Sequence, residues 1–144
     1  MHDRREHGQR CGRRAPTLGG IRARVDSRSK IVTPDRLPCP VTLVTGYFDV
    51  LRGEHARELR AIRQRSRGPL AVVILSRPDE ILSQAARAEL VAALRMVDYV
   101  ITADHEDLNR LIESAKPAEV VRLEAADLRW TERLIDHVQR GQTR

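Results

Sequence analysis

From residue 41 onward, short apolar runs alternate with segments in which apolar residues recur every three or four positions. Four runs predict buried strands, over residues 41–45, 70–75, 98–102 and 119–123. Four periodic segments predict helices, over residues 54–65, 84–96, 105–115 and 131–140. Strands that are apolar on both faces need cover on both sides. The pattern therefore predicts a parallel sheet in a Rossmann-like, three-layer α/β fold.

The first 30 residues lack this periodicity and carry scattered arginines and glycines. They cannot bury enough apolar surface to offset chain entropy, so we expect a disordered basic segment over 1–30 and a folded domain over 31–144. No run reaches the roughly 18 apolar residues of a membrane span. Cys11 and Cys39 lie 28 residues apart in a polar region, which excludes a disulfide scaffold and makes a reducing cytoplasm the expected compartment.

A net charge of +6 is a possible sign of nucleic-acid binding, but the charge is not evenly distributed along the chain. Residues 1–40 hold ten Lys/Arg and four Asp/Glu, whereas residues 41–144 hold sixteen of each sign. The folded part therefore has no excess of positive charge. Only 3% of the residues are aromatic, too few for a base-stacking surface. The composition argues against nucleic acid as a partner of the folded domain.

The turn after the first strand, residues 46–55, carries the strongest chemical signal. Gly46 at the strand end lets the backbone approach a ligand, and the helix that follows aims free N–H groups at the same place, which makes an anion site. His55 falls in the first turn of that helix, within reach of a phosphate. It is also in register with Leu51 and Leu59, so a partly buried core histidine is the alternative interpretation.

The stretch Val41–His55 resembles the opening of the cytidylyltransferase-like nucleotidyltransferases, whose signature is G-x-F-D-x-L-H-x-G-H. Residues 87–100, which begin with arginine and end in Val-Asp-Tyr-Val, are similar to a second family landmark, as are residues 30–33 and 117–122. The similarity is greatest to the adenylyltransferase domains of bacterial ADP-heptose synthases and covers about residues 30–123. It implies a four-stranded sheet of order 3-2-1-4.

The resemblance also implies a chemistry, the transfer of a nucleotidyl group from a nucleoside triphosphate to a phosphorylated small molecule with release of pyrophosphate. In the family, two histidines hold the triphosphate and stabilise charge at the α-phosphorus, and Mg2+ neutralises the leaving group. These catalytic roles fall here on His55 and Arg52. The resemblance places nucleotide contacts at Gly46, Tyr47, Phe48, Asp49, Arg87, Arg122 and Thr131. The sequence indicates no metal site made of protein ligands.

Two residues of the signature differ. Arg52 replaces the first histidine and keeps a cation that can make forked phosphate contacts. Glu54 replaces the glycine and sets a side chain and a negative charge against a polyphosphate. For Arg87, an exposed helical arginine is the alternative to a nucleotide contact.

The region after the fourth strand also differs from the family. The family's lysine-glycine motif reads Arg122-Leu123, and the tract 124–130 is too short for the usual fifth strand and phosphate loop. Thr131 is interpreted as a remnant of that loop that caps the last helix.

Three functions remain open at this point. One is a nucleotidyltransferase, whose partners are a nucleoside triphosphate and a phosphorylated small molecule such as a sugar phosphate. The second is a catalytically inactive family member, a pseudoenzyme acting as a nucleotide-binding or protein-interaction module. The third is a nucleic-acid-associated protein working through its basic tail. No membrane partner is expected. The sequence does not fix the oligomeric state, and a homodimer is one option because family members often dimerise.

Limited proteolysis tests the proposed domain boundary. Because exposed chain without a packed core is cleaved first, proteases should trim the N-terminus and leave a resistant core of about 12 kDa. Protection of the N-terminus would show that the boundary is wrong.

Overall fold

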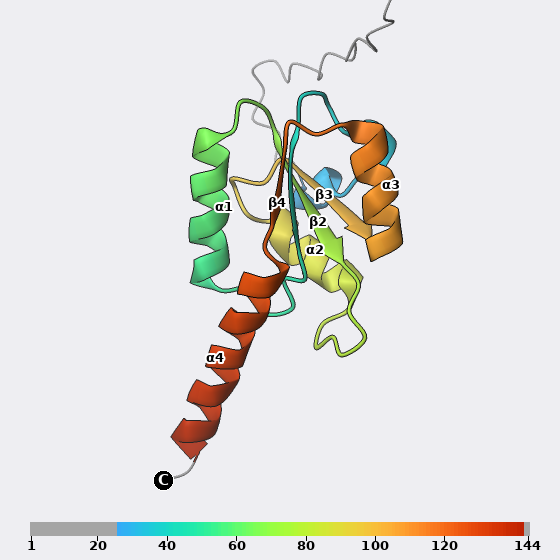
Figure 1. The fold of residues 1–144 in the computed structure, drawn as a ribbon. Coiled ribbons are helices and arrows are strands. Elements are labelled where there is room, and N and C mark those ends of the chain that lie inside the picture. Colours follow the sequence, from blue (N-terminus) through green and yellow to red (C-terminus); the bar gives the residue numbers. More distant parts are fainter. Residues whose placement is uncertain (1–25, 143–144) are drawn as a thin grey trace, which may run out of the picture.

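Strands and helices alternate through residues 26–142, the part of the chain that the computed structural model describes (Figure 1). The strands are β1 (Thr42–Gly46), β2 (Leu70–Leu75), β3 (Tyr99–Ala103) and β4 (Glu119–Arg122). The α-helices are α1 (Gly53–Arg65), α2 (Gln84–Ala92), α3 (His105–Ala115) and α4 (Glu124–Gln142). Two short 3-10 helices precede β1, η1 (Ser27–Lys30) and η2 (Pro34–Arg36).

The four strands form one parallel sheet in the order β3-β2-β1-β4. The Rossmann-like fold class and the order 3-2-1-4 expected from the sequence are confirmed. β1 is an inner strand, because it pairs with both β2 and β4. Open α/β folds bind ligands just beyond the carboxyl ends of their strands, and the carboxyl end of β1 lies in the middle of that side of the sheet. The turn that follows β1 is therefore at the place where such folds carry their chemistry.

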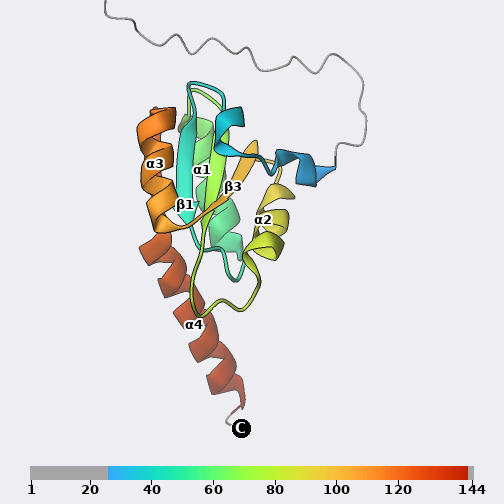
Figure 2. The ribbon, with the colours of Figure 1, turned by 90° about the vertical axis from the view of Figure 1, so that its right-hand side faces the viewer.

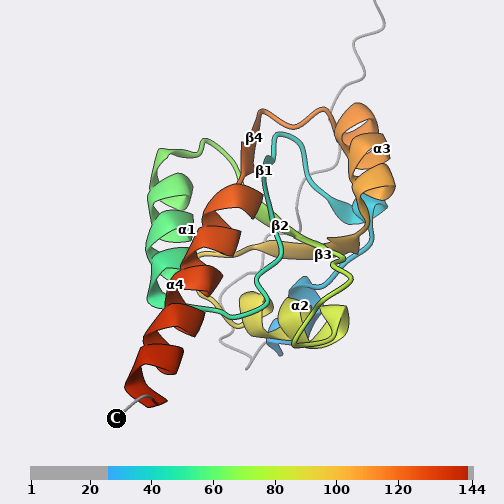
Figure 3. The ribbon, with the colours of Figure 1, turned by 60° about the horizontal axis from the view of Figure 1, so that its bottom comes forward.

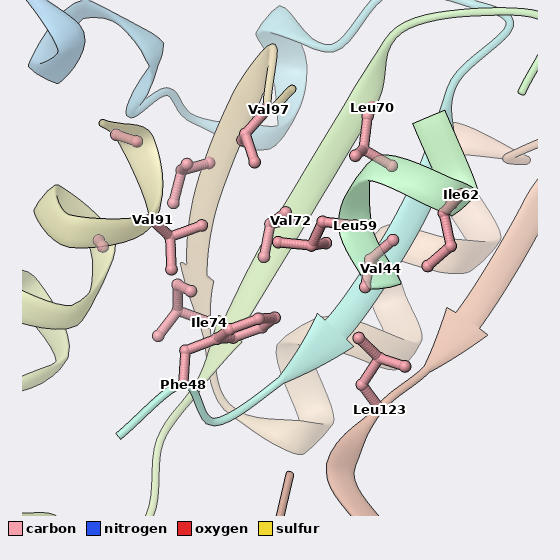
Figure 4. Packing of buried hydrophobic residues seen from close by; sticks show 13 residues of the cluster. Val44, Phe48, Leu59, Ile62, Leu70, Val72, Ile74, Val91, Val97 and Leu123 are labelled. Carbon is pink, nitrogen blue, oxygen red and sulfur yellow. The ribbon is translucent and has the colours of Figure 1, made fainter. Parts of the chain in front are cut away.

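Helices cover both faces of the sheet, as Figure 2 shows. One buried cluster joins the sheet to α1 and α2, and a second joins it to α3. In the first cluster, Leu59 of α1 packs with Val44 and Val72 of the sheet (Figure 4). Phe48, from the turn after β1, enters the same cluster and is fully buried. The core thus fixes the position of this turn.

The segment before β1 covers the β3 edge of the sheet. Ile31 forms a bridge to Val100, and the Lys30 ammonium donates a hydrogen bond to the carbonyl of Leu94 at 3.0 Å. Residues 27–30, which the sequence analysis assigns to a disordered segment, therefore belong to the fold as η1. The rest of that segment, residues 1–25, lies outside the described residues.

Two further observations concern Cys39 and the helices. Cys39 is disulfide-bonded, which the spacing of the two cysteines does not predict. Within residues 26–142, no helix combines the length and apolar character that crossing a membrane requires.

The last helix differs most from expectation. α4 begins at Glu124, directly after β4, so the tract 124–130 is helical and is not a remnant of a loop. Thr131 consequently lies inside α4, where its hydroxyl donates to the carbonyl of Asp127 at 3.1 Å, and the expectation that it caps the helix is wrong. Acidic residues in the first turn, Glu124 and Asp127, favour this earlier start because they complement the helix dipole. The final turns of α4 extend away from the body of the domain (Figures 1 and 3).

Arg87 of α2 is fully buried, so its interpretation as an exposed helical arginine is wrong. Its guanidinium forms an ion pair with the carboxylate of Glu80. It also donates hydrogen bonds at 2.7–3.1 Å to the carbonyl oxygens of Tyr47, Leu75 and Leu82. Arg87 thereby ties α2 to the end of β2 and to the turn after β1.

The substitution Arg87→Met tests this role by unfolding in urea. Methionine keeps much of the side-chain volume but leaves buried carbonyl groups without donors, so we expect a loss of about 3 kcal/mol in the free energy of unfolding. The matched control is Arg110→Met, which removes an exposed pair with Glu106 and should cost at most about 0.5 kcal/mol. Equal effects of the two substitutions would contradict the assigned role.

Candidate functional site

Two successive backbone N–H groups at the end of β1 point to one oxygen atom. The N–H groups of Tyr47 and Phe48 donate hydrogen bonds to Oδ2 of Asp127 at 2.8 and 2.7 Å. Phe48 has a φ of 52°, a conformation that bulky residues adopt only where the surrounding structure enforces it. Here the buried ring supplies that constraint. Convergent N–H groups of this kind form a concavity that binds anions.

Gly46 leaves space for the Phe48 ring and for the Asp127 carboxylate. A Cβ at this position would lie 2.7 Å from Cε2 of Phe48 and 3.3 Å from Oδ2 of Asp127. The sequence predicts a close approach of the backbone to an anion at Gly46. The structure shows that close approach, and the anion that it brings in is a carboxylate of the chain itself.

His55 binds the other oxygen of the same carboxylate. Its Nε2 lies 2.7 Å from Oδ1 of Asp127, and its Nδ1 accepts a hydrogen bond from the backbone N–H of Arg52 at 3.0 Å. Because Nδ1 is an acceptor, the hydrogen-bond pattern assigns the proton to Nε2, which donates to the carboxylate. His55 is completely buried and Asp127 is 2% exposed. The histidine thus occupies a core position with both ring nitrogens bound within the protein.

Arg52 and Glu54 lie at the start of α1, next to His55. Nη1 of Arg52 donates to the carbonyl of Trp130 at 2.8 Å, and Nε lies 3.3 Å from Oε2 of Glu54. The pKa of Glu54 is below its usual value because the carboxylate accepts a hydrogen bond from its own backbone N–H, and Arg52 adds to the shift. Glu54 is therefore negatively charged at neutral pH. The Arg52 guanidinium, which the sequence predicts to bind a phosphate, is instead bound by Glu54 and by the Trp130 carbonyl of α4.

The other predicted residues lie around this centre. The Asp49 carboxylate accepts hydrogen bonds at 2.9 Å from the N–H groups of Ile81 and Leu82, so it anchors the loop between β2 and α2. Arg122 is exposed at the end of β4, opposite Thr45 in the strand register. Five of the predicted residues lie together at the site: Gly46, Tyr47, Phe48, Arg52 and His55. Asp49 and Arg87 stabilise the turn, because Asp49 binds the loop before α2 and Arg87 binds the Tyr47 carbonyl.

Within residues 26–142, the polar groups of the site satisfy one another. No buried side-chain nitrogen or oxygen lacks a hydrogen-bond partner there. The same residues contain no group of three or more His, Cys, Asp or Glu side chains that could hold a metal ion.

Three residues of α4 complete the site and were missed by the sequence analysis. Asp127 supplies the carboxylate, Glu124 accepts a hydrogen bond from the hydroxyl of Thr45, and the ring of Trp130 meets His55 edge-on at 4.8 Å between centroids. One signal was present. Asp127 is four residues from both Leu123 and Thr131, so an acidic residue lies on the inward face of the helix.

Known proteins resemble this chain in sequence and in fold. No family model matches the chain. Curated relatives include an FAD synthase of Methanoregula boonei, which is 35% identical over 85 residues, or 54% of this chain and 56% of the relative. They also include the bifunctional protein HldE of Geobacter sulfurreducens, 33% identical over 92 residues, or 57% of this chain and 18% of the relative. The chain thus spans about half of the FAD synthase and a smaller part of HldE.

A solved structure matches the fold. It is the lipopolysaccharide core biosynthesis protein from Thermoplasma volcanium, with a TM-score of 0.51 and 23% identity over 56% of this chain and 70% of the other. The chain therefore shares the α/β fold of this structure. Its resemblance to the cytidylyltransferase-like proteins, inferred from the sequence, is confirmed by relatives that include HldE and FAD synthases.

The substitution Asp127→Asn tests the hydrogen bonds of the carboxylate. Whichever way the amide is turned, its NH2 group faces a donor, either Nε2–H of His55 or the two backbone N–H groups. We therefore expect a loss of about 1–3 kcal/mol in the free energy of unfolding, measured in urea. The control Asp136→Asn, at an exposed position of the same helix, should change stability by less than about 0.5 kcal/mol. A loss that is no larger for Asp127→Asn would contradict the hydrogen-bond assignment.

Proposed function

We propose that the domain binds a nucleoside triphosphate at the carboxyl end of β1 and transfers its nucleotidyl group to a phosphorylated small molecule, releasing pyrophosphate. One observation carries the proposal: the site already holds an anion. The Asp127 carboxylate accepts hydrogen bonds from two backbone N–H groups and from His55. A phosphate group has the same charge sign and the same kind of acceptor oxygen, so it suits the same donors.

Each residue of the site has a role in this proposal. The N–H groups of Tyr47 and Phe48 bind a phosphate oxygen, and Gly46 leaves room for it. Nε2–H of His55 donates to a second oxygen. Arg52 turns its guanidinium from the Trp130 carbonyl to the phosphates, as the expected catalytic pair with His55 requires. Support comes from the relatives, whose names describe nucleotide-forming enzymes.

The reaction needs mainly electrostatic help. An oxygen of the acceptor's phosphate attacks the α-phosphorus, and the bond from that phosphorus to the pyrophosphate oxygen breaks as the new bond forms. Fixed donors at the α-phosphate stabilise the negative charge that develops on its equatorial oxygens. Mg2+ enters this proposal with the nucleotide as the Mg-nucleotide complex, because the substrate phosphates supply much of the oxygen coordination that Mg2+ takes.

The other residues predicted to contact the nucleotide have less direct roles in this proposal. Arg122, exposed at the end of β4, is proposed to meet the nucleotide from the neighbouring strand. Asp49 and Arg87 are proposed to act on the nucleotide through the turn that they brace. Thr131 is proposed to act through α4, in which its hydroxyl is already hydrogen-bonded.

A non-catalytic module is the second candidate, and one observation favours it. The ionised carboxylate of Glu54 lies at the start of α1 and is paired with Arg52, so it opposes a polyphosphate and engages the cation that would bind it. The comparisons with enzymes do not favour this candidate. Measurement of nucleotide affinity separates the two.

The substitution Glu54→Gly tests the proposed site by calorimetry with ATP and CTP in the presence of Mg2+. Removal of the opposing charge and side chain should raise the affinity for the Mg-nucleotide about tenfold. Glu54→Gln separates charge from bulk, because it removes only the charge. His55→Ala should lower whatever affinity the protein has.

The matched control is Glu58→Gln, one turn further along α1. It removes the same charge and should leave the affinity unchanged within about twofold, since the charge lies farther from the phosphates. If Glu54→Gly and His55→Ala both leave the affinity unchanged, the turn after β1 is not a nucleotide site. The resemblance then describes ancestry and fold alone.

A further inference from the structure

The residues of α4 that are buried against the domain are polar, and its apolar residues Leu128, Trp130 and Leu134 are only half-buried. Of its 19 residues, only Asp127 and Thr131 are buried, and neither is apolar. The C-terminal part of the helix extends away from the sheet and from the other helices, as Figures 1 and 2 show from two sides. The exposed side chains there include Ile135 and Val138, 46% and 50% accessible. Little hydrophobic burial therefore holds α4 in place.

The hydrogen bonds between the first turns of α4 and the domain go to one short stretch, residues 45–55. Thr45 donates to Glu124 at its first turn. The Asp127 carboxylate sits on the turn after β1 and on His55, as described above. One turn further, the Trp130 carbonyl accepts from Arg52. Apart from Thr45, the residues that hold α4 are thus the ones to which the proposed function assigns the nucleotide phosphates.

We propose that α4 is a displaceable plug of the nucleotide site, with Asp127 as the group that occupies the phosphate position. The proposal rests on the nucleotide site proposed above and adds its regulation. The N–H groups of Tyr47 and Phe48 can bind either Oδ2 of Asp127 or a phosphate oxygen, because two oxygen atoms cannot occupy the same position. The docked helix and the bound phosphate therefore exclude each other. A polyphosphate carries more charge than the carboxylate and can compete for the same donors.

This arrangement sets the apparent affinity. When only the undocked fraction of molecules binds the nucleotide, the apparent dissociation constant is the intrinsic one divided by that fraction. Weakening the docking contacts should therefore strengthen nucleotide binding, although the altered residues lie outside the turn. If α4 had only a structural role, weakening its docking contacts should lower the nucleotide affinity, because the loosened helix would disturb the site.

Trp130 reports the position of the plug. It is the only tryptophan of the chain, and its ring lies edge-on against His55. Departure of α4 should move this ring into water and shift its emission to longer wavelength. Inorganic tripolyphosphate with Mg2+ is a suitable first probe, since it carries the phosphates without an absorbing base, and Mg-ATP is the second.

The experiment compares the full-length wild type with Glu124→Gln, Asp127→Asn and the control Glu132→Gln, which alters an exposed residue further along α4. In the wild type, either probe should shift Trp130 emission to the red and saturate, whereas sodium chloride of equal ionic strength should not. Glu124→Gln weakens the plug without touching the phosphate position, so its affinity for Mg-ATP by calorimetry should rise about threefold to tenfold. Asp127→Asn should also bind more tightly, and its emission should be red-shifted before any probe is added. Glu132→Gln should match the wild type.

Two results would overturn the proposal, and they differ in what else they overturn. If Mg-ATP binds by calorimetry but Trp130 emission stays constant and Glu124→Gln gains no affinity, the nucleotide site stands and the plug is wrong. If neither the wild type nor the two plug variants bind Mg-ATP or tripolyphosphate, the proposed nucleotide site and the plug both fail. Should Asp127→Asn prove too unstable to study, Glu124→Gln decides the question alone.

Discussion

The rest of the site depends on the hydrogen bonds that the Asp127 carboxylate accepts. Its two oxygens join three elements, because Oδ2 accepts from the turn after β1, Oδ1 accepts from His55 of α1, and the residue itself belongs to α4. This carboxylate receives the Nε2–H of His55 and, together with the Phe48 ring, occupies the space that a side chain at position 46 would need. A buried carboxylate is costly unless donors surround it, and here its partners supply them all.

The same carboxylate decides how the fold relates to function. Parallel α/β sheets gather backbone donors at the carboxyl ends of their strands, and an anion is the natural occupant of that place. In this chain the occupant is part of a helix that adds little apolar burial of its own. A contact made of charge-assisted hydrogen bonds is strong, yet a ligand with more charge can replace it, whereas a packed apolar interface could not be exchanged in this way.

Much of the fold could be predicted from the sequence, because apolar runs and helical periodicity are local signals. The site was predictable only where its residues are close in the chain. The turn around Gly46 and the placement of His55 in the first turn of α1 followed from the signature motif. The role of Asp127 did not, since it depends on a contact across about 80 residues that no spacing records. Arg87 shows the same limit, because a buried guanidinium and an exposed one look alike until the carbonyl partners are known.

The central claim is that the Asp127 carboxylate holds the two N–H groups of the turn and the Nε2–H of His55, and nuclear magnetic resonance of the nitrogen-15 labelled protein tests it most directly. In the free protein, we expect the Tyr47 and Phe48 amide protons to resonate far downfield and to be protected from exchange with solvent. The His55 ring should show a protonated Nε2 and an unprotonated Nδ1. Rapid exchange of both amide protons, or a His55 proton on Nδ1, would contradict the account.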